Sequence, residues 1–138
     1  MEKRLVIATH GRFAEGIYDS LKMIVGDVKN IEVFTAYVED AKDYSKEIAN
    51  IVTKHDYDEK QLVVITDLFG GSINNEFMQY VNQYPFYLLT GLNLGLLLSL
   101  IMVQESLTPD SIESLIAETQ TYVKWCRRID NYEDDESF

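Results

Sequence analysis

The sequence predicts an α/β fold in which a doubly wound, mainly parallel sheet carries helices on both faces. Four short apolar runs alternate along the chain with segments whose apolar residues recur at helical spacing. The runs are too short for helices, and their β-branched content is typical of buried parallel strands. No repeat, linker or low-complexity segment divides the 138 residues, which suffice for one domain with its own core.

The strands and helices are expected in alternation. Strands are expected at residues 4–9, 31–37, 61–66 and 86–90. Helices are expected at residues 13–25, about 40–54, from Ser72, about 94–104, and after the cap Thr108-Pro109-Asp110. The positions expected to face the core are Ala14, Ile17, Leu21, Ile24 and Val25, then Ala41, Tyr44, Ile48, Ile51 and Val52, then Ile73, Phe77, Tyr80 and Val81, and finally Ile112, Leu115, Ile116 and Thr119. Residues 122–129 either continue the last helix or form a short final strand.

The expected strand order brings two polar residues together. If the first strand is central and the second and third flank it, the order is 2-1-3-4 and the chain reverses between strands 1 and 3. His10 follows the first strand and Asp67 follows the third. Open α/β sheets bind ligands at the carboxyl ends of their strands, at such a switch point. We therefore expect His10 and Asp67 in one crevice.

A histidine and a carboxylate in one crevice can carry out nucleophilic chemistry. A neutral imidazole attacks through one nitrogen, and a carboxylate that accepts a hydrogen bond from the other fixes the tautomer, which assigns catalytic roles to His10 and Asp67. Gly11 and the Gly70-Gly71 pair allow an anion to approach the backbone closely, and Ser72 adds a hydroxyl donor. The sequence thus predicts a site for a phosphoryl group at which Gly11, Gly70, Gly71 and Ser72 bind phosphate.

Other chemistries lack their residues in this sequence. Neither a Walker-type loop nor a GxGxxG motif is present, so bound ATP or a dinucleotide is not supported and no cofactor is expected. Ser72 does not lie in the Gly-x-Ser-x-Gly elbow of a hydrolase, and the chain has too few His and Cys residues for a metal site. Arg12 either neutralises phosphate charge or is solvated. His55 is predicted to be a solvated loop histidine.

Charge and cysteine content restrict the partners and the compartment. The net charge of -11 makes nucleic acid and anionic membranes poor partners, although it would attract a basic protein. The single cysteine, Cys126, cannot form an intrachain disulfide, is expected to be half-buried, and does not require an oxidising compartment. No signal peptide is recognised at the start of the sequence.

One segment is apolar nearly all round. Residues 94–103 are almost continuous in Leu, Ile and Met, yet they have half of the about 20 residues that a membrane span needs. A small domain can hardly cover such a helix on every side, so we predict a homodimer. The domain is expected over residues 1–129, followed by an acidic tail over residues 130–138.

Three ordered motifs resemble a known family. They are Ile7-Ala8-Thr9-His10-Gly11, then Thr66-Asp67-Leu68-Phe69-Gly70-Gly71-Ser72 with Asn74 and Asn75, then Thr90-Gly91-Leu92-Asn93-Leu94. Over residues 4–128 the chain resembles the IIA domain of the mannose-class (mannose/fructose/sorbose) sugar phosphotransferase system. The resemblance implies that His10 is phosphorylated on Nε2, that Asp67 is bonded to Nδ1, and that Ser72 lies beside the phosphate. A threonine often stands in the family where this chain has Leu68, which removes one hydroxyl donor.

The resemblance also implies partners and a location. Such IIA domains take phosphate from the phosphocarrier protein HPr and give it to a IIB component, expected here as a separate chain, and they serve the membrane components IIC and IID indirectly. The family is cytoplasmic and dimeric, and its C-terminal strand crosses to the partner subunit. Two other functions stay open: the phosphotransfer subunit of a dihydroxyacetone kinase, and a non-catalytic regulatory dimer that binds a basic protein.

Overall fold

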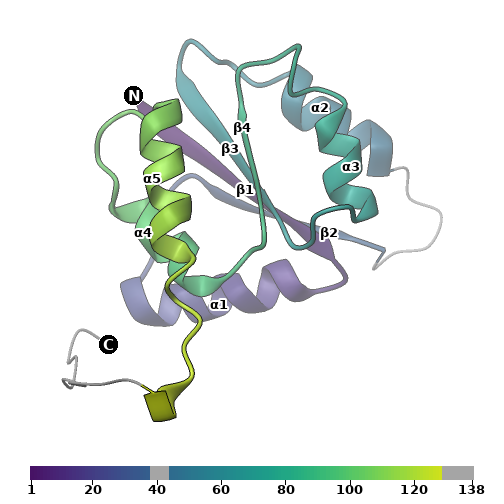
Figure 1. The fold of residues 1–138 in the computed structure, drawn as a ribbon. Helices are drawn as coiled ribbons and strands as arrows, with labels where there is room; N and C mark the ends of the chain where they lie inside the picture. The colour runs from purple at the N-terminus through teal and green to yellow at the C-terminus, as the bar shows by residue number, and fades with distance from the viewer. Residues whose placement is uncertain (38–43, 129–138) are drawn as a thin grey trace.

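Within the described residues, strands and helices alternate along the chain as expected until the end, where two helices follow one another. The structure is a computed structural model that describes residues 1–37 and 44–128 (Figure 1). Its elements are β1 (Glu2–His10), α1 (Phe13–Val25), β2 (Ile31–Ala36), α2 (Tyr44–Thr53), β3 (Lys60–Thr66), α3 (Ser72–Met78), β4 (Tyr87–Thr90), α4 (Leu94–Met102) and α5 (Pro109–Thr119), followed by a short 3-10 helix at Cys126–Arg128. The prediction of an α/β fold is confirmed.

The four strands form one parallel sheet in the order β2-β1-β3-β4. This is the predicted order, and it makes β1 and β3 the central strands. The register pairs His10 with Ala36 on β2 and Ala8 with Thr66 on β3. The carboxyl ends of the three strands therefore lie at one edge of the sheet, where the chain reverses direction between β1 and β3.

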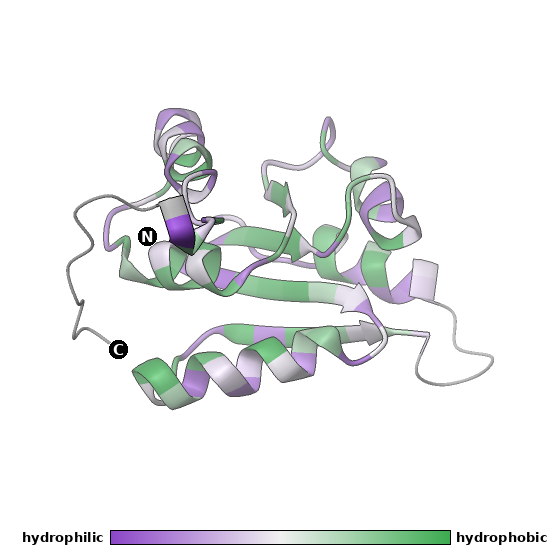
Figure 2. Cartoon of the chain, turned by 60° about the horizontal axis from the view of Figure 1, so that its bottom comes forward, coloured by the Kyte–Doolittle hydropathy of each residue, from purple (hydrophilic) through white to green (hydrophobic). Residues whose placement is uncertain are grey.

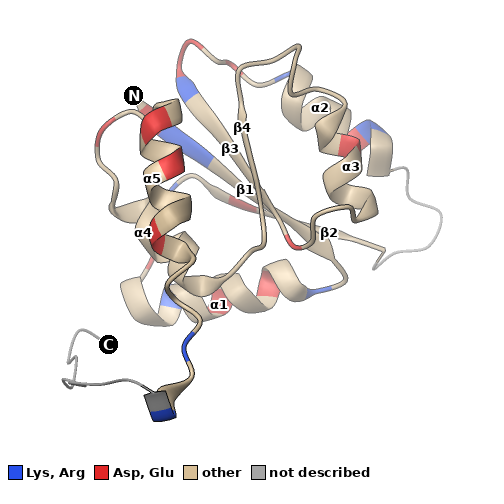
Figure 3. Ribbon diagram, viewed as in Figure 1, with Lys and Arg blue, Asp and Glu red and all other residues tan. Residues whose placement is uncertain are grey.

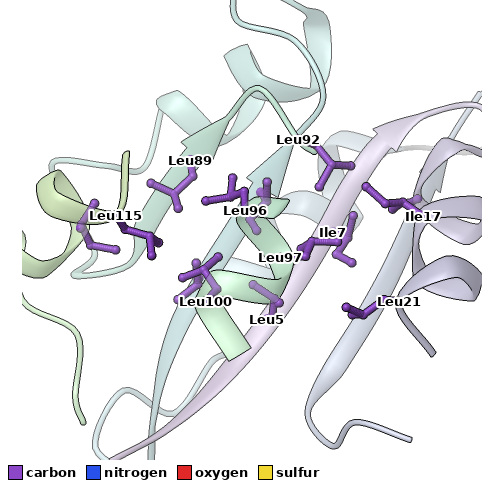
Figure 4. Close-up of a cluster of buried hydrophobic side chains, with 14 of the residues drawn as sticks. Leu5, Ile7, Ile17, Leu21, Leu89, Leu92, Leu96, Leu97, Leu100 and Leu115 are labelled. Atoms are coloured by element: carbon purple, nitrogen blue, oxygen red, sulfur yellow. The ribbon is translucent and has the colours of Figure 1, made fainter. Parts of the chain in front are cut away.

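Helices cover both faces of the sheet, because successive side chains of a strand point to opposite faces. Leu5 and Ile7 of β1 pack with α1, α4 and α5, whereas Val6 and Ala8 pack with α2 and α3. Figure 4 shows the first of these cores, with the leucines of α4 placed against β1 and α1. Figure 2 shows the strands coloured mostly as hydrophobic, between helices of mixed colouring. This double burial explains the nearly continuous apolar strands in the sequence.

The apolar faces expected for the first and last helices include residues that the structure leaves partly exposed. Ile24 and Val25, expected in the core, are 40% and 39% exposed at the end of α1. This last turn lies toward the amino ends of the strands, where β2 has not yet begun, since its pairing with β1 starts at Leu5. Ile116 is also 39% exposed, because α5 contacts the core through Ile112 and Leu115. Ala41 lies outside the described residues.

The chain after α5 forms neither of the two expected structures within the described residues. Helix α5 ends at Thr119, and residues 122–128 contain a 3-10 turn rather than a strand. Cys126 is exposed, so the prediction of a half-buried thiol is wrong, because the turn that carries it does not pack on the core. The acidic tail at residues 130–138 lies outside the described residues.

Helix α4 receives more cover from its own chain than its composition predicts. Leu96, Leu97 and Leu100 are buried against the sheet and α5. The ring of Tyr122 lies close against Gly95, where an added Cβ would come within 2.4 Å of Cδ2 of the ring. Met102 nevertheless remains 74% exposed. None of the helices in the described ranges is long and apolar enough to cross a membrane.

His55 lies at the amino ends of the strands and has two hydrogen-bond partners, so it is not a solvated loop residue. Nε2 lies 2.7 Å from the carbonyl oxygen of Lys60, which accepts, so Nε2 carries the proton. Nδ1 then accepts from the guanidinium of Arg4 at 3.2 Å. The same guanidinium is paired with both carboxylate oxygens of Glu32. His55 thus completes a cluster that ties β1, β2 and the start of β3 together.

The Arg4–Glu32 pair predicts how stability changes in acid. The hydrogen bond from Arg4 to the Glu32 carboxylate holds the pKa of Glu32 below the ordinary value of 4.5. Because the pKa of Glu32 is lower in the folded state, the ionised side chain stabilises the fold at pH values above 4.5. This contribution is lost as the pH falls through the folded-state pKa. Because half of the side chain is exposed, Glu32→Gln should lower the free energy of unfolding by about 0.5 kcal/mol at neutral pH. As the pH falls below the folded-state pKa of Glu32, the two proteins should converge.

Urea denaturation followed by circular dichroism between about pH 7 and pH 3 measures this difference. Glu113→Gln, on the exposed side of α5, is the matched control. A constant difference between Glu32→Gln and the unmodified protein at every pH would contradict the prediction.

Candidate active site

His10 is the last residue of β1 and lies at the carboxyl edge of the sheet. The strand stops there because Gly11 adopts a left-handed φ of 56° and its N–H donates to the carbonyl of Ala36 at 2.8 Å. The buried hydroxyl of Thr9 accepts from the N–H of Ala14 at 2.8 Å, which fixes the start of α1. The side chain of His10 is left 39% exposed between these two anchored segments.

Asp67 orients the imidazole as expected from the strand order. Its Oδ2 lies 3.0 Å from Nδ1 of His10 and accepts from the backbone N–H of His10 at 2.9 Å. A carboxylate oxygen can only accept here, so Nδ1 carries the proton and Nε2 keeps its lone pair. The other carboxylate oxygen, Oδ1, is buried without a hydrogen-bond partner among the described residues. The structure therefore brings His10 and Asp67 together in the orientation that a nucleophilic histidine needs.

Ser72 and the two glycines before it reach the other side of the ring. Ser72 Oγ lies 3.2 Å from Nε2 of His10. A Cβ at Gly71 would come within 3.2 Å of Cε1 of the imidazole and 3.1 Å of the Leu68 carbonyl oxygen, so the close approach favours glycine. Gly70 has a left-handed φ of 79° and turns the chain into α3. The double glycine thus lets the loop lie beside the imidazole.

A buried polar network supports this loop. The Thr66 hydroxyl lies 2.7 Å from Oδ1 of Asn74 and 2.9 Å from the hydroxyl of Thr90. Thr66 is fully buried and Asn74 is 2% exposed, so the network joins β3, α3 and β4 directly behind Asp67. Asn74 and Thr90 carry the family resemblance, yet the sequence alone did not predict this supporting role.

Tyr37 is a site residue that the sequence analysis missed. It follows β2, whose last residue pairs with His10. Its ring stacks on the imidazole, with centroids 5.5 Å apart and an interplanar angle of 21°. Its hydroxyl lies 2.8 Å from Oγ of Ser72. The available signal was positional: a polar aromatic side chain directly after the strand that flanks β1 at the same edge.

Three residues expected near an anion have partners within the protein. The Arg12 side chain is 71% exposed and lies 3.7 Å from a carboxylate oxygen of Glu15, an ion pair within α1. The N–H of Gly71 donates to the carbonyl of Leu68 at 3.1 Å, just as the N–H of Gly11 has an acceptor in Ala36. These two N–H groups already have acceptors, whereas the Ser72 hydroxyl lies 3.2 Å from Nε2.

Three large apolar side chains are exposed on the segments next to His10 and Asp67. Phe13, Leu68 and Phe69 are 47%, 63% and 76% exposed on the segments that follow β1 and β3. The lysines and arginine of the central strands lie at their amino ends, the edge opposite His10, and appear in blue in Figure 3. This contrast makes the rim around His10 suitable for contact with another protein.

The fold and the site together define a class of α/β proteins that carry an oriented histidine at the switch point of a parallel sheet. A family model described as EIIA-man, the fructose IIA component of the phosphotransferase system, matches residues 4–120. The chain belongs to this family, and the resemblance seen in the sequence is confirmed. It is a IIA-type component of the mannose/fructose class of the sugar phosphotransferase system.

Three solved structures agree with this assignment. A proposed phosphoenolpyruvate-dependent sugar phosphotransferase system permease from Klebsiella pneumoniae is 34% identical, with a TM-score of 0.84 and 93% of each chain covered. A mannose/sorbose-specific IIA subunit from Enterococcus faecalis is 26% identical, with a TM-score of 0.74 over 98% of this chain and 100% of that chain. A IIA protein associated with the fucose utilization operon of Streptococcus pneumoniae is 25% identical, with a TM-score of 0.74 over 93% of this chain and 96% of that chain.

Proposed function

We propose that this chain accepts a phosphoryl group from the phosphohistidine of the phosphocarrier protein HPr on His10 and passes it to the IIB component during sugar uptake. The observation that carries the proposal is the orientation of the imidazole. Nδ1 donates to Asp67, so Nε2 holds a lone pair beside the hydroxyl of Ser72 at a partly exposed edge. Membership of the family supports phosphoryl transfer as the reaction, and the geometry supports Nε2 of His10 as the attacking atom.

The transfer follows from these contacts. The lone pair of Nε2 attacks phosphorus, a new N–P bond forms, and the bond to the donor nitrogen breaks with its electron pair leaving on the donor. Positive charge develops on the imidazole, and the Asp67 carboxylate stabilises it through Nδ1. The Ser72 hydroxyl loses its acceptor when Nε2 is phosphorylated and can then donate to a phosphoryl oxygen. The same steps in reverse transfer the phosphoryl group from Nε2 to IIB.

The phosphate-binding roles of the glycines are part of the same proposal. Gly71 leaves space beside the imidazole, where a Cβ would come within 3.2 Å of Cε1, and Gly11 and Gly70 adopt the left-handed φ angles that turn the chain at the site. Ser72 provides a hydroxyl within 3.2 Å of Nε2. The glycines therefore contribute by their lack of a side chain and by their backbone conformation, whereas Ser72 contributes a hydrogen-bond donor.

The partners and the location follow from this role. The apolar rim of Phe13, Leu68 and Phe69 offers one docking surface at His10, which HPr and IIB would use in turn. The membrane components IIC and IID are reached indirectly, through IIB. A chain that exchanges phosphate with HPr works in the cytoplasm. We further propose that residues 1–129 act as one domain, in keeping with the family match over residues 4–120.

We also propose that the chain is a homodimer. Met102 at the end of α4 is 74% exposed, and Val123 and Trp125 in the segment after α5 are 94% and 65% exposed. Apolar side chains of this size, gathered in the C-terminal third of the chain, are typical of an interface between subunits.

Light scattering at micromolar concentration tests the dimer. The expected mass is twice the chain mass of 15.9 kDa. Met102→Glu should lower the mass toward the monomer, because it buries a charge in the interface. Met23→Glu, at a residue that is 89% exposed on α1, is the matched control and should not change the mass. A monomeric mass for the unmodified chain would rule the dimer out.

Intact mass measurement tests the phosphohistidine. Incubation with phosphoenolpyruvate, enzyme I and HPr should add one acid-labile phosphate to each chain. His10→Ala should abolish the gain, whereas His55→Gln, which changes the other histidine, should keep it. An equal gain in His10→Ala would disprove the site.

The same assay separates the alternative functions. Adding the cognate IIB should discharge the chain, and a kinase-bound nucleotide should not. Discharge by the nucleotide would favour the dihydroxyacetone kinase system instead. A regulatory dimer would gain no phosphate at all.

Asp67→Ala should slow phosphoryl transfer by about 10- to 1000-fold, because the ring loses the acceptor that fixes its tautomer. Rapid-quench kinetics with phosphorylated HPr measures the rate, and urea denaturation verifies that the variant is folded. Asp58→Ala, an exposed aspartate in the loop before β3, is the control. Transfer at the unmodified rate in folded Asp67→Ala would refute the orienting role.

A further inference from the structure

The hydrogen bonds around Nε2 form a chain with one direction. Nδ1 of His10 donates to Asp67, so Nε2 accepts, and the Ser72 hydroxyl is its donor at 3.2 Å. A hydroxyl has one proton, so Ser72 cannot also donate to Tyr37. The Tyr37 hydroxyl must therefore be the donor in the 2.8 Å contact with Ser72 Oγ. The chain runs from Tyr37 through Ser72 and His10 to Asp67.

The Tyr37 side chain contacts two other rings. One face of its ring lies on the imidazole of His10, and the ring of Tyr44 meets it at a centroid distance of 5.3 Å and an angle of 62°. The contact with Tyr44 is edge-to-face, a favoured arrangement for aromatic pairs. These contacts fix the direction of the hydroxyl toward Ser72.

The backbone of Tyr37 is strained. Its φ of 64° lies in the left-handed region, which bulky L-residues rarely adopt. Burial does not explain this conformation, because the residue is 60% exposed. Strain of this kind persists where surrounding contacts demand it, and it gathers at functional sites. The contacts present here are those to His10, Ser72 and Tyr44.

We propose that Tyr37 is a second hydroxyl donor of the phosphohistidine site, holding Ser72 toward Nε2 in the free protein and donating to a phosphoryl oxygen once His10 is phosphorylated. The inference rests on the proposed phosphorylation of His10. It assigns Tyr37 a direct contact with the transferred group, at a site where Leu68 has no hydroxyl to offer and the N–H groups of Gly11 and Gly71 already have acceptors.

The reaction allows this exchange of hydrogen bonds. When the Nε2–P bond forms and the bond from phosphorus to the donor breaks, Ser72 loses Nε2 as its acceptor. The phosphoryl group brings anionic oxygens to the same place, and hydroxyl donors bind such oxygens more strongly than they bind another hydroxyl. Tyr37 and Ser72 then each donate to the phosphoryl group, and no other co-reactant is needed.

The transfer equilibrium between HPr and this chain is the first test. Tyr37→Phe removes the hydroxyl and keeps the ring, so it should shift the equilibrium about tenfold toward phosphorylated HPr. Tyr37→Gly removes the ring as well, but it suits the left-handed backbone, so the fold should survive and the shift should be at least as large. Tyr87→Phe is the matched control, since it loses a tyrosine hydroxyl bonded to the carbonyl of Leu107 at the other end of the sheet.

Phosphoramidate, a small-molecule donor that phosphorylates imidazoles, provides a second test that does not need HPr. The phosphorus resonance of labelled Tyr37→Phe should titrate at higher pH than that of the unmodified chain, because a donor hydrogen bond favours the dianion. Labelling by phosphoramidate without labelling by HPr would defeat the proposed function and leave this test of Tyr37 intact. Absence of any labelling at His10 would overturn both.

The result that overturns the role of Tyr37 is specific. It is a Tyr37→Phe variant with the transfer equilibrium and the phosphorus titration of the unmodified chain. An equal shift in Tyr87→Phe would also overturn it, because the effect would then be a general one.

Discussion

The site depends on one shared acceptor, Oδ2 of Asp67. This oxygen accepts from the backbone N–H of His10 at 2.9 Å and from Nδ1 of the same residue at 3.0 Å. The first bond fixes the end of β1 to the end of β3, and the second sets the tautomer of the ring. The strand geometry and the reactivity of Nε2 are therefore set by one carboxylate, which the Thr66–Asn74–Thr90 network supports from behind.

The parallel sheet makes this arrangement possible. Because β1 and β3 are neighbours that run in the same direction, residues that directly follow them meet at one edge without any long loop. The same rule places Tyr37 there from β2. The chain contributes three site residues from three adjacent strands, and the buried strands keep the distances between these residues fixed.

The periodic and positional signals in the sequence were sufficient for much of this structure. Strand order and the pairing of His10 with Asp67 follow from apolar runs and crossover rules, and the structure has both. The same positional rule places Tyr37 at this edge, but its contact with the imidazole also depends on a left-handed backbone that nothing in the sequence signals. Ile24 and Ile116 were misplaced because periodicity finds the face of a helix but not where the neighbouring elements end. His55 was misjudged because its partner, Arg4, lies 51 residues away in the chain.

The crowding around the imidazole affects the order in which partner proteins can reach Nε2. Tyr37 covers one face of the ring, and the loop at Gly71 passes close to Cε1. In the proposed transfer, the single nitrogen Nε2 can serve one protein at a time, so the donor would have to depart before the acceptor arrives. During that interval no second protein shields the charged group from water. The lifetime of the proposed phosphohistidine would then be a property of this chain alone, and it would limit how long the chain can hold the phosphoryl group before its next partner binds.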